Sequence, residues 1–130
     1  MGRKRIVPIE SRTLKYFYII IVKFHKQKLI KFGVTNNFVR RFREYNNKDT
    51  IGKFEKVLHL YKCEFPKRIE YSIKWKLTKF AKPVFKQEYF ETKHYDKIHE
   101  MFHKFVETYG YKAIEIIDIE NYYKDLLKKR

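Results

Sequence analysis

Two groups of side chains in this sequence have the chemistry to act on a phosphate. Arg40, Arg41 and Arg43 stand close together, and a planar guanidinium can hold a phosphate through two parallel hydrogen bonds. Glu70 is an isolated acid in a basic stretch, two residues beyond Arg68. Hydrolysis of a phosphodiester requires a base for water, a cation near the phosphate and a group that stabilises the departing oxygen. The structural alternatives are a solvated basic helix face and an acid that complements a helix dipole.

A third candidate is the string His99-Glu-Met-Phe-His103, which spells HExxH. Two histidines one helical turn apart can share a zinc ion, and the glutamate between them can act as a general base. No third ligand is well placed, although Glu115 and Glu120 lie downstream. Because both histidines border an apolar helical stripe, we interpret them as residues that flank the core and not as a metalloprotease site.

The charge of the chain indicates an anionic partner. Thirty-one Lys and Arg residues against fifteen Asp and Glu residues give a formal net charge of +16, and the excess is spread from one end of the sequence to the other. Nucleic acid is the favoured partner, because each phosphate that a basic residue neutralises releases condensed counterions. The alternative is a generally basic protein encoded by AT-rich DNA, since Lys, Ile, Asn, Tyr and Phe are all abundant.

The elements that must position these residues begin with a predicted β-hairpin. Residues 16–22 form a β-branched and aromatic run, and a polar turn at 26–28 leads into a second apolar run at 29–32. Such a pair of runs is typical of two adjacent strands. Gly33 ends the second strand, where the absence of a Cβ permits a close approach of the backbone to substrate or to the next helix.

Helical periodicity follows the hairpin. Thr35 or Asn36 is expected to cap a helix that carries apolar residues at i, i+4 and i+7 and ends at residues 46–49. Residues 53–65 read as a third strand. Pro66 then stands near the start of a helix that runs to about Phe80. At the start of a helix the missing N–H of proline costs little.

The last third of the chain is predicted to be mainly helical. Residues 87–90 form a short extended segment, and residues 94–109 form an amphipathic helix that Gly110 ends. Residues 113–119 are either a strand or the start of a helix, and a basic helix continues to Arg130.

These elements predict an α+β fold, an α/β sandwich with a small, central, mostly antiparallel three-stranded sheet flanked by helices. We expect a single domain, in which residues 13–92 form the core and residues 93–130 form a C-terminal helical extension packed on it. The single cysteine, Cys63, excludes an intrachain disulfide. No apolar run approaches the roughly 20 residues that span a bilayer, so we expect a soluble, intracellular protein without a membrane partner.

The order of several short motifs resembles the GIY-YIG endonuclease superfamily, in particular the short branch common in phages and large DNA viruses. The resemblance covers residues from about Tyr16 to Glu91 and depends on the motifs occurring in the family's order. The similar segments are Tyr16-Phe-Tyr-Ile-Ile, Lys31-Phe-Gly-Val-Thr35, Arg40-Arg-Phe-Arg-Glu-Tyr45, Arg68-Ile-Glu70 and Lys86-Gln-Glu-Tyr-Phe-Glu91.

The resemblance implies roles for five residues of the hairpin and the helix after it. Tyr18 would orient or deprotonate the attacking water, although its pKa would have to be lowered by a nearby cation for it to act as a base. Lys31 stands where the family often has its second tyrosine and would act as a base or steady the phosphate charge. Gly33 would allow close approach to the nucleic acid. Arg41 would hold the scissile phosphate, and Tyr45 would lie near the water or the leaving group.

The resemblance also implies that Glu70 binds a single divalent cation, Mg²⁺ or Mn²⁺. Mg²⁺ keeps several waters and uses few protein ligands, so one carboxylate can suffice. Arg40, Arg43 and Lys74 are expected to contact nucleic acid, most simply double-stranded DNA. The implied function is a metal-dependent endonuclease that hydrolyses phosphodiester bonds in DNA.

The alternative is a catalytically weak or inactive nucleic-acid-binding module of the same fold, and three departures from the family's pattern bear on the activity more than on the fold. The first motif lacks its glycine, so the tyrosine assignment can shift from Tyr18 to Tyr16. Lys74 stands where the branch often has histidine. Gly33 is not followed by a second glycine, which the branch does not require.

Overall fold

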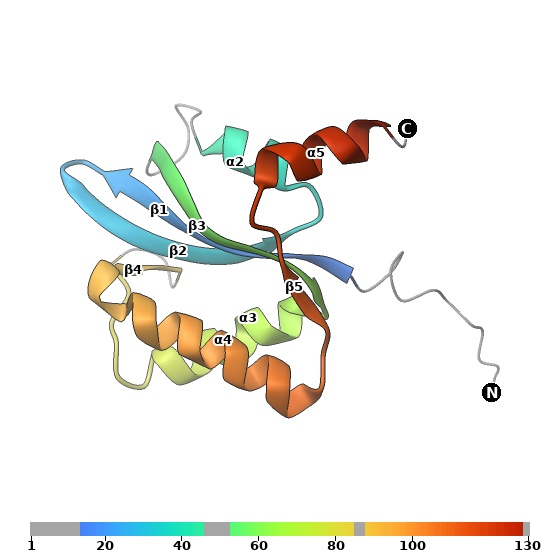
Figure 1. Ribbon diagram of the computed structural model, residues 1–130. Coiled ribbons are helices and arrows are strands. Elements are labelled where there is room, and N and C mark those ends of the chain that lie inside the picture. Colours follow the sequence, from blue (N-terminus) through green and yellow to red (C-terminus); the bar gives the residue numbers. More distant parts are fainter. Residues whose placement is uncertain (1–13, 46–52, 85–87, 129–130) are drawn as a thin grey trace, which may run out of the picture.

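The computed structural model describes residues 14–45, 53–84 and 88–128. Within these residues the order of strands and helices is close to the predicted one (Figure 1). The elements are β1 (Leu14–Phe24), β2 (Gln27–Thr35), α2 (Phe38–Glu44), β3 (Lys53–Glu64), α3 (Pro66–Leu77), β4 (Tyr89–Glu91), the 3₁₀ turn η1 (Thr92–His94), α4 (Tyr95–Tyr109), β5 (Ala113–Glu115) and α5 (Ile119–Lys128).

The strands form one five-stranded antiparallel sheet in the order β4-β2-β1-β3-β5. The α+β class therefore holds, but the prediction of a three-stranded sheet is wrong. The hairpin β1–β2 and the returning strand β3 form the expected centre of the sheet. β4 adds a strand at one edge, and β5 adds a strand at the other. Each of these edge strands has only three residues, which is too short for the apolar alternation that identifies a strand in a sequence. β5 also interrupts the stretch that was expected to be a helical extension.

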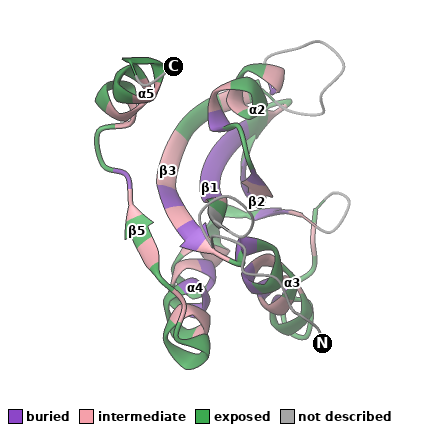
Figure 2. Ribbon diagram, turned by 90° about the vertical axis from the view of Figure 1, so that its right-hand side faces the viewer, coloured by how far each residue is buried: buried purple, intermediate pink, exposed green. Residues whose placement is uncertain are grey.

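Alternate side chains of β1 enter two different halves of the core. Phe17 and Ile19 pack with α3 and α4, whereas Tyr18 and Ile20 pack with α2 and α5. Figure 2 shows α3 and α4 on one side of the curved sheet and α2 and α5 on the other. Because β1 is buried on both faces, its sequence is an unbroken apolar run and not an alternating one.

Two local features differ from the predictions around the hairpin and the first helix. The turn between β1 and β2 consists of His25 and Lys26, and His25 has a φ of 57°. The N-cap of α2 is Asn37, whose side chain accepts a hydrogen bond from the backbone N–H of Arg40 at 3.0 Å. Thr35 instead accepts from the backbone N–H of Asn37 at 3.0 Å, so it orders the turn that leads into the helix. Residues 46–49, which were expected to end this helix, lie outside the described residues.

The junction between β3 and α3 is sharp. Phe65 has a φ of 46° and precedes Pro66, the first residue of α3. A residue before proline is disfavoured in the right-handed helical region, so the helix begins at the proline, as predicted. The first turn of α3 therefore starts directly at the end of the sheet, so the basic residues of that turn lie beside the sheet.

Among the described residues, no helix has both the length and the apolarity needed to cross a membrane.

Candidate functional site

Tyr18, the first predicted site residue, fits into the sheet because its partner is a glycine. Tyr18 on β1 is paired with Gly33 on β2. A Cβ added to Gly33 would lie 2.7 Å from Oη and 2.9 Å from Cζ of Tyr18, closer than real Cβ atoms approach. Gly33 does not have a positive φ, so it is the phenol, and not a special backbone conformation, that requires the glycine. The structure thus gives Gly33 a packing role in addition to the predicted one.

Tyr18 belongs to a buried group of phenols. Its hydroxyl lies 3.0 Å from the hydroxyl of Tyr45, which follows the last residue of α2. Burial raises the pKa of Tyr18 to about 12, although the hydrogen bond to Tyr45 and the charge of Arg41 oppose the shift. Burial and the adjacent Tyr18 also raise the pKa of Tyr45 well above its ordinary value. Both phenols therefore keep their protons at neutral pH, and they can orient a water molecule but not deprotonate it.

A chain of alternating charges leads from the edge of the sheet to α3. Lys31, a buried residue of β2, forms an ion pair with Glu88, and Glu88 Oε2 lies 3.2 Å from Lys74 Nζ on α3. Lys74 Nζ lies in turn 3.8 Å from Glu70 Oε2. Burial lowers the pKa of Lys31, and Glu88 opposes this shift. Burial acts to raise the pKa of Glu88, but hydrogen bonds and charges from Lys31 and Lys74 lower it overall, so Glu88 is ionised at neutral pH.

The first turns of α3 line two hollows that share Lys67. We call them the Glu70 hollow and the Thr35 hollow, and their volumes are about 500 Å³ and 380 Å³. The described residues that line the Glu70 hollow are Lys67, Arg68, Glu70, Tyr71, Lys74 and Glu88. Those that line the Thr35 hollow are Lys15, Val34, Thr35, Asn36, Arg40, Arg41, Phe65, Pro66 and Lys67. β4 pairs only with Leu29–Lys31 of β2, and the Thr35 hollow lies beyond that end, where β2 leads into α2.

Four of the nine predicted site residues line these two hollows: Glu70 and Lys74 line the Glu70 hollow, and Arg40 and Arg41 line the Thr35 hollow. The charges of both Arg41 and Glu70 act on the Tyr18 phenol, which is buried and lines neither hollow. Arg40 lines the Thr35 hollow, with its Nε 3.7 Å from Glu44 Oε2. Arg43 is exposed on α2 and lines neither hollow.

Two residues of the site were missed in the sequence. Glu88 lies in the segment recognised as the end of the motif series, yet only the paired edge strand reveals that it meets Lys31. A usable signal was Lys31 itself, because a lysine in an apolar strand needs a carboxylate partner if it is buried. Lys67 was missed because nothing in the sequence indicates that the hollows on either side of the first turn of α3 share it.

Glu70 is the residue best placed to hold a metal ion. Its side chain is 12% exposed and lines the hollow, and its contact with Lys74 at 3.8 Å is longer than a charge-assisted hydrogen bond of about 2.8 Å. The part of the chain that the structure describes contains no group of three or more His, Cys, Asp or Glu side chains that could hold a metal ion. A cation at Glu70 would take most of its ligands from water and phosphate, which is the coordination that Mg²⁺ prefers.

The HExxH string lies elsewhere, at the border of the core between α4 and β3. The Nε2 atoms of His99 and His103 are 3.1 Å apart, and the hydroxyl of Tyr61 lies 2.8 Å and 3.2 Å from them. His99 also stacks on His59, with ring centroids 3.8 Å apart. Glu100, which would be the base of a protease, is exposed and pairs with Lys97 at 3.5 Å. The two histidines thus lie where the core-flanking interpretation put them.

This histidine cluster predicts a loss of stability in acid. Burial, with the neighbouring His59 and His103, lowers the pKa of His99 to about 4. Above the unfolded pKa of about 6.5 the imidazole is neutral in both the folded and the unfolded state. As the pH falls from there toward 4, the unfolded state binds a proton that the folded state does not bind, so stability is lost. We expect the free energy of unfolding to fall by about 1–2 kcal/mol more over that range in wild type than in His99→Gln, after allowance for solvent screening.

The measurement is urea unfolding at several pH values between 7.5 and 4.5. Thr108→Ala, an exposed and non-titrating change on the same helix, is the control and should keep the wild-type dependence on pH. An unchanged pH dependence in His99→Gln would show that another group causes the loss.

Comparison with known proteins identifies a domain family for most of the chain. The T5orf172 domain model matches residues 15–113, which include β1 except its first residue, the elements from β2 to α4 and all the residues of the two hollows. No curated protein and no solved structure matches the chain significantly. The match is compatible with a role as a nuclease or a nucleic-acid-binding protein. The chain therefore belongs to the T5orf172 domain family, a phage-associated and broadly nuclease-like family.

Proposed function

We propose that the protein is a metal-dependent endonuclease of the GIY-YIG type that hydrolyses phosphodiester bonds in DNA. The observation that carries the proposal is a nearly buried carboxylate, Glu70, in a hollow lined by basic residues, with Arg41 on the neighbouring hollow that shares Lys67. An acid among lysines and arginines suits a metal–phosphate pair better than a phosphate alone, because the negative charge of the acid would repel a phosphate without a metal ion between them.

The basic residues between the two hollows would position the DNA backbone. Arg41 lines the Thr35 hollow, and its Nη1 lies 3.5 Å from Glu44 Oε1, a loose pair that a phosphate can replace with two parallel hydrogen bonds. Lys67, which both hollows share, and Arg68 would hold the neighbouring phosphates. These contacts read no base sequence, so we expect weak sequence preference from this part of the site.

The phenols and the buried ion pair would order the attacking water. Tyr18 keeps its proton at neutral pH, so we assign it an orienting role and not that of the base. Glu88 is ionised and lines the Glu70 hollow, where its carboxylate can accept a hydrogen bond from water. Lys31 holds Glu88 in place through the ion pair, which makes it a positioning residue in this scheme.

The metal proposed here would be held by Glu70, with Glu88 as the second carboxylate on the same hollow. When bound, Mg²⁺ or Mn²⁺ would supply positive charge next to the phosphate and stabilise the charge that develops on it. Lys74, which contacts both carboxylates, would have to move or share them, and its charge would then be available to the DNA.

A nucleic-acid-binding module without catalysis is the alternative. It is favoured by the raised pKa values of Tyr18 and Tyr45 and by the lysines that already neutralise Glu88. The basic residues around the hollows would then bind phosphates without any reaction. Binding alone would account for the net charge of +16.

The test removes the metal from the wild-type protein. Supercoiled plasmid should be nicked or linearised in Mg²⁺ or Mn²⁺ and should remain intact in EDTA, whereas a gel-shift assay in EDTA should still show DNA binding. DNA binding without cleavage in either metal would support the binding module. Cleavage that persists in EDTA would exclude the metal-dependent mechanism.

A further inference from the structure

The outer face of α3 presents aromatic side chains to solvent. Tyr71 and Trp75 lie one helical turn apart and are 67% and 58% exposed. A single exposed aromatic residue on a soluble protein requires no explanation, but two adjacent ones form a platform that remains unused within this fold. Both rings are largely open to solvent, although the Lys79 side chain lies over the ring of Trp75.

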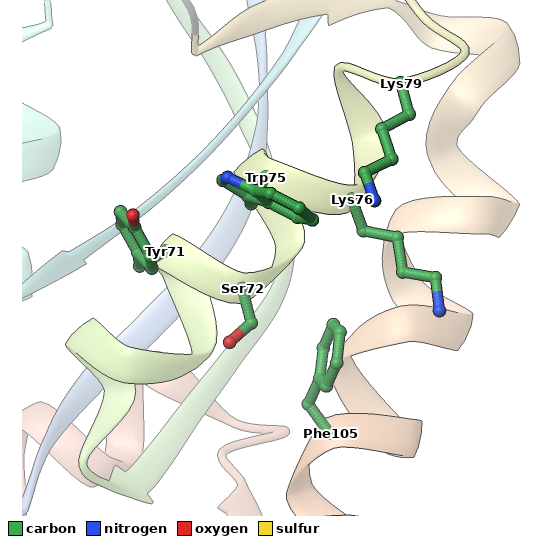
Figure 3. A pocket seen from close by; sticks show the side chains of 6 residues that line it. All are labelled: Tyr71, Ser72, Trp75, Lys76, Lys79 and Phe105. Atoms are coloured by element: carbon green, nitrogen blue, oxygen red, sulfur yellow. The ribbon is translucent and has the colours of Figure 1, made fainter.

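The platform borders a pocket between α3 and α4. The pocket has a volume of about 390 Å³, within the range of roughly 300–1,000 Å³ that is typical of small-molecule sites. Figure 3 shows Tyr71 and Trp75 on α3 and Phe105 across from them on α4. The described residues that line it are Tyr71, Ser72, Trp75, Lys76, Lys79 and Phe105.

The charges around this pocket favour an anionic ligand with flat rings. Lys79 Nζ lies 3.9 Å from the centroid of the Trp75 ring, and Lys76 lines the same pocket. None of the described lining residues is acidic. A planar ring that carries phosphates matches this combination, because the ring can stack on the aromatic faces while the lysines neutralise the phosphates.

The pocket also adjoins the candidate active site. Tyr71 lines both this pocket and the Glu70 hollow, and Glu70 and Tyr71 are neighbours in α3. A strand whose phosphate occupies the Glu70 hollow would therefore pass its next nucleotides over Tyr71 toward Trp75. This arrangement joins a backbone-binding hollow to a base-binding platform.

We propose that Tyr71 and Trp75 form a stacking platform for unpaired bases of single-stranded DNA, adjacent to the phosphate-binding hollow. The proposal relies on the proposed function only in taking the basic hollow as a site for nucleic acid, and it does not depend on cleavage. Bases within a duplex stack on each other and do not expose their faces, so the platform selects single strands, overhangs or branch points.

Trp75 is the single tryptophan of the chain, so its fluorescence reports on this platform alone. In EDTA, titration with a single-stranded oligothymidine should quench the emission saturably. A blunt-ended duplex of two complementary strands, with the same nucleotide count and no loop, should bind with little quenching. Equal quenching by both nucleic acids, or by neither, would overturn the proposal.

Variants separate stacking from simple charge attraction. Tyr71→Ala retains the fluorescent reporter and should weaken single-strand affinity on the order of tenfold. Trp75→Ala, measured by anisotropy of a labelled oligothymidine, should show a similar loss, and Trp75→Phe should recover part of it. Ile117→Ala is the control, because Ile117 is 80% exposed and lies outside the pocket.

Circular dichroism and thermal melting should show that the variants remain folded. Unchanged single-strand affinity in both Tyr71→Ala and Trp75→Ala would overturn the platform. Cleavage of plasmid in Mg²⁺ without quenching by single strands would refute the platform and leave the proposed nuclease intact. Quenching by single strands without any cleavage of plasmid would refute the proposed nuclease and leave the platform intact.

Discussion

Glu70→Gln is expected to reduce the rate of DNA cleavage by about 10³-fold or more. A metal ion beside a phosphate supplies several kcal/mol of transition-state stabilisation, and each 1.36 kcal/mol corresponds to a factor of ten in rate. Glutamine has the shape of glutamate without its charge, so the variant removes the proposed metal ligand and preserves packing. DNA binding should be retained or strengthened, because an acid has been removed from a basic hollow.

The measurement is single-turnover cleavage of plasmid DNA across a series of Mn²⁺ concentrations, with binding measured in parallel by gel shift. Glu120→Gln is the matched control, since Glu120 is exposed on α5, away from both hollows. The melting temperature of Glu70→Gln should stay near that of wild type, because its contact with Lys74 is long. Wild-type cleavage rates in this variant would refute the role of Glu70 as metal ligand.

The centre of this fold could be predicted from the sequence because its elements are long and apolar. The run at 16–22, the hairpin and the helix that begins at Pro66 all have clear periodicity or turn residues. A short extended segment at 87–90 and a possible strand at 113–119 were predicted, but not that β4 and β5 join the sheet, because three residues provide no alternation. Their pairing depends on contacts with β2 and β3 that are far away in the sequence.

Some residues of the candidate site could likewise be predicted from the sequence, and others could not. Arg41 and Glu70 could be named from the order of motifs, and the structure places them on two hollows that share Lys67. The partner of Lys31 could not be named, since Glu88 reaches it only through the edge strand β4. The electrostatic state of Tyr18 was also out of reach, because its raised pKa arises mainly from burial, which no local sequence pattern reports.

The site could be predicted only in part because it lies at one edge of the sheet. Tyr18 and Lys31 point into the α2 side of the sheet, whereas Glu70 and Lys74 belong to α3 on the other side. The two groups meet past the short strand β4, through Glu88. A site that joins both faces of a sheet depends on how far the edge strand extends, so small changes in β4 should alter the chemistry more than the fold.

Gly33→Ala is expected to lower the free energy of unfolding by about 2–3 kcal/mol, as overpacking of a tight core does. The new Cβ would meet Oη and Cζ of Tyr18 at 2.7 Å and 2.9 Å. The ring is 1% exposed and held between β2 and α2, so it cannot turn away without disturbing its hydrogen bond to Tyr45. Cleavage should fall together with stability, because the displaced phenol is the group that orients water in the proposed mechanism.

A double-mutant cycle measured by urea unfolding isolates this contact. Tyr18→Phe removes the Oη contact but keeps Cζ. In the Tyr18→Phe background, Gly33→Ala should therefore lower the free energy of unfolding by less than in wild type, but still lower it. Gly110→Ala is the contrasting control: Gly110 has a φ of +72° and no atom within 4 Å of an added Cβ, so its cost of about 1 kcal/mol comes from the backbone. That cost should be independent of Tyr18. Strict additivity of Gly33→Ala and Tyr18→Phe would mean that the glycine is needed for something other than the phenol.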